Sequence, residues 1–111
     1  MSMKDLLKEF HTYTSLWKEK SPEQISKFME LLEAIEKPGY LDTKIKELIA
    51  VAISVVVQCQ WCIAFHVKSA LDAGAKPEEI REAAWVAVLM GGGPKLAYMQ
   101  LVEKALEEFS R

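Results

Sequence analysis

The fold is decided by the run LIAVAISVVV at residues 48–57, the longest nearly uninterrupted apolar stretch of the chain. Its β-branched residues suit a buried strand as well as a helix, because a short apolar run does not separate the two. No second run of this kind exists for it to pair with, and an isolated strand would leave its backbone groups unsatisfied. The run is therefore predicted to be a helix. It is about half as long as the roughly 20 residues that span a bilayer.

Helix start and stop signals recur on both sides of this run. Ser21 followed by Pro22, with Gln24 three residues after the serine, is a strong helix start, and Asp42 can cap the helix that contains the run. Pro38-Gly39 and Gly74 are typical helix ends. The chain is therefore predicted to be all-α, a small domain of about six helices. We expect one helix after Ser2 and others over about 22–37, 43–57, 60–73, 77–90 and 95–109.

Length and composition describe a single domain over residues 1–111. Of the 111 residues, 50% are hydrophobic, 27% are charged and only four are proline, which suits one hydrophobic core and excludes collagen-like or disordered chains. The net charge of −2 argues against a nucleic-acid-binding surface. No basic segment followed by an apolar stretch opens the chain, so we expect no signal peptide, no membrane partner and a cytoplasmic location.

Two of the predicted helices, over about 43–57 and 77–90, are apolar nearly all round. Such helices belong at the centre of a hydrophobic core, and the core of a domain of this size has room for only one central helix. A homo-oligomer that buries the second helix is the economical inference, and Ala83, Ala84 and Ala87 would let another helix approach closely. The alternative is a monomer that holds Trp85 and Met90 inside its own core.

The two cysteines form the motif Cys59-Gln60-Trp61-Cys62. Two cysteines cannot make the disulfide framework of a small secreted protein, so a close pair indicates a redox dithiol or half of a metal site. On a helix, Cys62 and His66 are four residues apart and share a face with Cys59. If the preceding helix turns near Gln58 and packs antiparallel, Glu47 lies within about one helical turn, roughly 5 Å, of the level of His66.

Each member of this group has a chemical role in dithiol chemistry. A helix N-terminus favours the thiolate, which is the nucleophile, and an imidazole can take up or return a proton near neutral pH. Glu47 could orient His66, and the second cysteine closes a disulfide after the first is oxidised. Cys62 stands one turn before His66, so we expect it to attack and Cys59 to resolve. The opposite order stays open, because Cys59 is nearer the helix end.

Around these residues the sequence resembles the active-site pattern of the alkylhydroperoxidase AhpD-like proteins, which belong to the carboxymuconolactone decarboxylase superfamily. The resemblance rests on Glu47, eleven intervening residues, the Cys59–Cys62 motif, three more residues and His66. Its flanks agree, namely KELIAVAIS before the motif, CIAFHVKSALDAGA through it and LMGGGP downstream. It covers about residues 41–109.

The resemblance implies an all-α subunit that assembles into trimers or hexamers. It implies thiol-dependent, peroxiredoxin-type reduction of small-molecule hydroperoxides or disulfides by Cys59, Cys62, His66 and Glu47, with no cofactor, no required metal and a separate thiol as reductant. This chain departs from the best-known members at Trp61, where they carry a second histidine. One proton-relay partner of those members is therefore absent here.

Three other functions compete with this interpretation. A structural zinc site could use Cys59, Cys62 and His66, with Glu47 as a further candidate ligand, since these are donors that zinc accepts. Lactone decarboxylation follows from the superfamily name, although it would not need the dithiol. An oligomeric interaction module without catalysis has no positive feature in its favour. His11 is expected to face solvent and receives no role.

Overall fold

The computed structural model describes residues 1–110, which form six helices and no β-strand. This confirms the all-α prediction, including the helical state of the run at residues 48–57. The helices are α1 (Met3–Lys20), α2 (Pro22–Glu36), α3 (Thr43–Val56), α4 (Gln60–Asp72), α5 (Pro77–Gly91) and α6 (Gly93–Phe109).

The helix ends follow the predicted signals, with two corrections. Ser21 precedes α2 as predicted, but its side chain makes no capping hydrogen bond. The side chains of Ser2 and Asp42 accept backbone N–H groups at the starts of α1 and α3, as their sequence positions predict. The last helix begins at Gly93, two residues before the predicted start at Lys95. Gly92 adopts a left-handed φ of 76° and turns the chain by itself, so Pro94 falls in the first turn of α6, where its missing N–H costs nothing.

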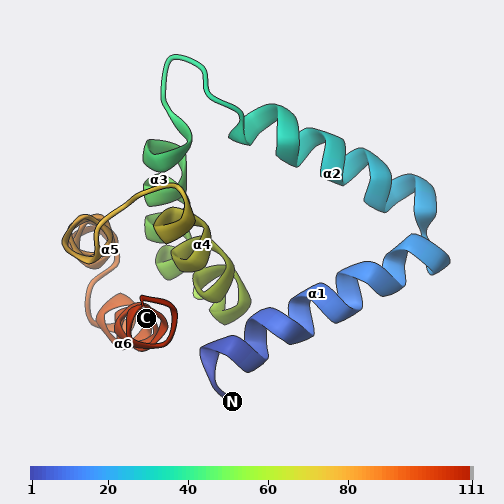
Figure 1. Cartoon of the computed structure of the whole chain (residues 1–111). Coiled ribbons are helices and arrows are strands. Elements are labelled where there is room, and N and C mark those ends of the chain that lie inside the picture. The colour runs from blue at the N-terminus through green and yellow to red at the C-terminus, as the bar shows by residue number, and fades with distance from the viewer. Residues whose placement is uncertain (111) are drawn as a thin grey trace.

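The helices α3 to α6 pack into one bundle, and α1 and α2 form a V-shaped hairpin whose two ends both meet the bundle (Figure 1). The core lies where α3, α4, α5 and α6 meet, and the start of α1 closes it. Each backbone N–H of Met3 and Lys4 donates to the carboxylate of Glu108, which fastens the N-terminus of α1 to the end of α6. The largest core side chains that are fully buried and apolar are Met3, Ile63, Ile80, Val51, Val55, Val67 and Val102.

Large apolar faces stay outside this core. The helix α2 buries no residue at all, and along α5 the side chains of Trp85 and Met90 are 54% and 78% exposed. The alternative prediction, that Trp85 and Met90 lie in the core of their own subunit, is therefore wrong. The small side chains of Ala84 and Ala87 face the core instead. No helix in residues 1–110 is long and apolar enough to cross a membrane.

Candidate active site

A sharp turn between α3 and α4 places the first cysteine. Gln58 adopts a left-handed φ of 56°, which is uncommon for a residue with a side chain, and the backbone N–H of Cys59 donates back to the carbonyl of Ser54. Cys59 is then the N-cap of α4, in extended conformation. The turn thus lets α4 run back along α3 directly after the cysteine.

The two cysteines are joined by a disulfide, with their Cα atoms 5.2 Å apart. The backbone N–H of Cys62 donates to Sγ of Cys59 over 3.1 Å, so the first sulfur also caps the helix. A sulfur at this position feels the partial positive charge of the helix N-terminus, which stabilises a thiolate once the bond is reduced. Because both sulfurs are used in this bond, the structure gives less support to a zinc site built on the cysteines.

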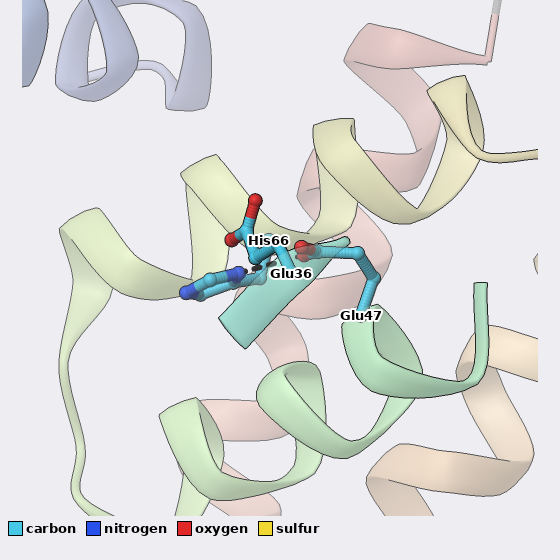
Figure 2. Close-up of side chains that lie close together, drawn as sticks. All are labelled: Glu36, Glu47 and His66. Atoms are coloured by element: carbon cyan, nitrogen blue, oxygen red, sulfur yellow. Dashed lines mark hydrogen bonds and ion pairs between the residues drawn. The ribbon is translucent and has the colours of Figure 1, made fainter. Parts of the chain in front are cut away.

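Glu47 and His66 meet across the interface of α3 and α4, as the predicted antiparallel packing requires. Nδ1 of His66 lies 2.8 Å from Oε2 of Glu47 (Figure 2). Glu47 is only 2% exposed, whereas the His66 side chain is 22% exposed. The carboxylate therefore holds one ring nitrogen of the imidazole and leaves Nε2 as the nitrogen available for proton transfer.

A second carboxyl group, that of Glu36 at the end of α2, joins this pair. One donor atom from each of Glu36, Glu47 and His66 lies within 4.8 Å of the others (Figure 2). The pKa of Glu36 is raised by burial and further by its hydrogen bond with Glu47 and the charge of Glu47. In residues 1–110 these three side chains are the group placed to hold a metal ion together, and neither cysteine belongs to it.

A cleft of about 490 Å³ opens over Cys62 and His66, between α4 and the hairpin of α1 and α2. Cys59 does not line it. Phe65 packs edge-on against His66, with ring centroids 5.0 Å apart, and thereby walls the imidazole on one side. The rest of the lining is divided equally between apolar residues, namely Phe10, Phe28, Met29 and Leu32, and polar ones, namely His11, Thr14, Ser15 and Lys18.

Trp61 lies outside this cleft. Its indole N–H donates to Oε1 of Glu9 over 2.9 Å, and its ring borders a smaller hollow with Tyr13 and Trp17 of α1. The side chain that stands between the two cysteines thus fastens the start of α4 to α1. It takes a packing position here rather than one at the cleft.

Sequence reasoning missed two residues near the site. Glu36 ends a helix that buries nothing, so no periodic pattern marks it. His11 is exposed, as predicted, yet it lines the cleft, because the hairpin folds its helix over α4. Neither position carries a local signal that could have revealed it, since both depend on packing between distant segments.

Taken together, the fold and the site define an all-α protein that carries a Cys-x-x-Cys disulfide beside a buried glutamate–histidine pair. The model of the carboxymuconolactone decarboxylase family matches residues 9–104. The chain belongs to this family, which confirms the resemblance and extends it toward the N-terminus beyond residue 41.

Similar proteins agree in sequence and in fold. "Uncharacterized protein 4 in cox locus" of Paracoccus denitrificans is 43% identical over 81 residues, 73% of each chain. A carboxymuconolactone decarboxylase family protein of Legionella pneumophila, solved in its apo form, is 39% identical and superposes with a TM-score of 0.95 over 98% of this chain and 97% of its own. A Thermotoga maritima family member, described as "possibly involved in antioxidative response", is 30% identical, with a TM-score of 0.84 over 94% and 89% of the two chains.

Proposed function

We propose that this protein is a thiol-dependent oxidoreductase that reduces hydroperoxides through Cys59 and Cys62, with His66 and Glu47 as a proton relay. The observation that carries the proposal is the Cys59–Cys62 disulfide at the start of α4, one turn from an imidazole held by a buried carboxylate. The description of the Thermotoga maritima relative as "possibly involved in antioxidative response" is in line with this proposal.

The reaction starts from the dithiol. The thiolate of Cys62 attacks one oxygen of the hydroperoxide, the O–O bond breaks, and the leaving alkoxide takes a proton from His66 to become an alcohol. Cys62 is then a sulfenic acid. The thiolate of Cys59 attacks its sulfur and releases hydroxide, which leaves as water after taking a proton, and the disulfide forms. An external thiol reductant supplies two electrons and two protons to restore the dithiol.

The cleft favours Cys62 as the attacking residue. Cys62 and His66 both line the cleft, whereas Cys59 does not and accepts the capping hydrogen bond of α4. A substrate that enters between α4 and the hairpin would thus meet Cys62 first. The dipole of α4 and the position of Cys59 at its N-terminus favour a reactive thiolate at Cys59 instead. Trapping of sulfenic acid in single variants distinguishes the two roles.

The test is a free-thiol count before and after one equivalent of hydroperoxide, followed by trapping of sulfenic acid in single variants. We expect two thiols to disappear in the wild type. Cys59→Ser should form a trappable sulfenic acid, and Cys62→Ser should not. The reverse pattern would exchange the two roles. A wild type that keeps both thiols free would contradict the proposal. A disulfide without sulfenic acid in either variant would indicate a disulfide reductase instead.

We also propose that the subunit works as a homo-oligomer, a trimer or larger. Besides Trp85 and Met90, Leu89 of α5 is 81% exposed, and Ile49 and Ile53 of α3 are 46% and 55% exposed. Large apolar side chains that are exposed on two helices packed against each other are typical of interfaces between subunits. Sedimentation at micromolar concentration should show a trimer or larger assembly, and a 12.6 kDa monomer would contradict it.

A further inference from the structure

We propose that Glu36, Glu47 and His66 form a binding site for Zn²⁺. The site would take two carboxylate oxygens and Nδ1 of His66, and a water molecule would complete four-coordination. It is distinct from the cysteines, and its occupancy does not depend on the proposed peroxide chemistry.

The donor atoms come from three helices and converge without help from a ligand. Nδ1 of His66 is 2.8 Å from Oε2 of Glu47, and the donor atoms of all three residues lie within 4.8 Å of one another. Ligand atoms around tetrahedral zinc, at about 2.0–2.1 Å from the ion, lie roughly 3.3 Å apart. Small rotations of the half-buried Glu36 and His66 side chains around the buried Glu47 would therefore reach coordination geometry.

Glu36 is held at this place by α3, although its own helix buries nothing. Nζ of Lys46 donates to the carbonyls of Ile35 and Lys37, the two neighbours of Glu36, at 2.7 Å each. The hydroxyl of Thr43 donates to the carbonyl of Glu36 itself over 3.0 Å. These three hydrogen bonds clamp the end of α2 so that the carboxyl group of Glu36 points at Glu47 and His66 (Figure 2). Such an outer layer of support is what metal sites require of their ligands.

The charges around the group call for a cation. Glu47 is only 2% exposed. In residues 1–110, only His66 and Glu36 are placed to pair with it. No lysine or arginine of the described chain forms an ion pair with Glu36 or Glu47, and the nearby Lys46 is engaged with backbone carbonyls. The negative charge of these two adjacent carboxyl groups can be balanced by a protonated His66, by a proton shared between the carboxyl groups, or by a metal ion.

An ion can reach the group from two sides. His66 borders both the 490 Å³ cleft and a second hollow of about 210 Å³, which Glu36, Lys46 and Glu47 also line. A mixed imidazole and carboxylate set suits Zn²⁺ and disfavours Mg²⁺, which prefers oxygen ligands alone. If the proposed relay is correct, bound Zn²⁺ would occupy both of its side chains and would slow peroxide reduction.

The experiment is calorimetric titration of the EDTA-treated disulfide form with Zn²⁺, with Mg²⁺ in parallel. Because the cysteines are oxidised, they cannot supply thiolate ligands. We expect one Zn²⁺ per chain, and a Glu36→Gln variant that binds more than about 100-fold more weakly, since loss of a ligand exceeds the 10–100-fold typical of supporting residues. The exposed neighbour variant Glu33→Gln and the double variant Cys59→Ser/Cys62→Ser should bind as the wild type does.

Three results would overturn the site. They are no Zn²⁺ binding by the wild type, unchanged binding by Glu36→Gln, or loss of binding when both cysteines are replaced. Circular dichroism of Glu36→Gln checks that it folds. If it does not, His66→Gln provides the second test, again with Glu33→Gln as the control. None of these readouts uses peroxide, so a failed metal site and a failed peroxidase remain distinguishable.

Discussion

The coupling between Glu47 and His66 can be tested by a double-mutant cycle on the first oxidation step. Glu47→Gln removes the charge of the carboxylate and keeps its shape, and His66→Gln removes the ring that exchanges protons. If the carboxylate acts only by holding the imidazole, either change disables the same unit. The two single variants should then be oxidised more slowly by similar factors, and the double variant should be little slower than either of them.

The structure sets the size of the expected effect. The two side chains lie 2.8 Å apart, and Glu47 is 2% exposed, so solvent screens their interaction weakly. A hydrogen bond with a charged partner contributes about 1.5–3 kcal/mol net, and we take about 2 kcal/mol because the imidazole is partly open. At about 1.4 kcal/mol per factor of ten, each single variant should slow oxidation ~30-fold. The double variant should also be ~30-fold slower, where independent effects would give ~900-fold.

The assay is rapid mixing of the reduced protein with excess hydrogen peroxide, acid quenching and counting of free thiols. Circular dichroism and thermal unfolding of each variant establish that the fold is kept. A double variant that is slowed by the product of the single effects would show that Glu47 and His66 act separately. A Glu47→Gln variant with the wild-type rate would show that the buried carboxylate has no part in the step.

Three further predictions concern stability, acid sensitivity and assembly. Ile63→Ala, at a fully buried position, should lower the free energy of unfolding by about 3 kcal/mol and the Tm by about 10–15 °C, and the partly exposed Ile45→Ala far less, in thermal unfolding at one protein concentration. Burial raises the pKa of Glu108, but the backbone N–H groups of Lys4 and Met3 and the charges of Lys104 and Lys4 together lower it below 4.5. The stabilisation from Glu108 is therefore present above pH 4.5 and is lost as the pH falls through the lowered pKa. Urea unfolding of Glu108→Gln should accordingly show reduced stability at pH 7 and a flatter decline in acid, and a decline as steep as in the wild type would contradict this. Leu89→Glu should shift sedimentation toward the monomer, and an unchanged assembly would exclude this face of α5 from the interface.

Local signals in the sequence account for the helices and for the pairing of Glu47 with His66. A cap, a proline in the first turn or a glycine after the last turn acts through backbone groups a few residues away, so these ends are readable without tertiary structure. Glu47 and His66 lie on consecutive helices joined by a tight turn. Their register therefore follows from the helical rise and a single turn.

Only the tertiary structure decided what surrounds that pair. Glu36 reaches it because α3 clamps the end of α2, a contact whose partners are set by packing and not by any periodic pattern. The cleft over Cys62 exists because the hairpin of α1 and α2 folds across α4. Likewise, apolar periodicity predicts which helix faces avoid water, but it does not show which of these faces the subunit itself buries. Only the packing of the bundle shows that Trp85 and Met90 lie on the surface. The sequence thus determines local geometry through short-range hydrogen bonds and helical periodicity, while the meeting of distant side chains depends on which faces pack together.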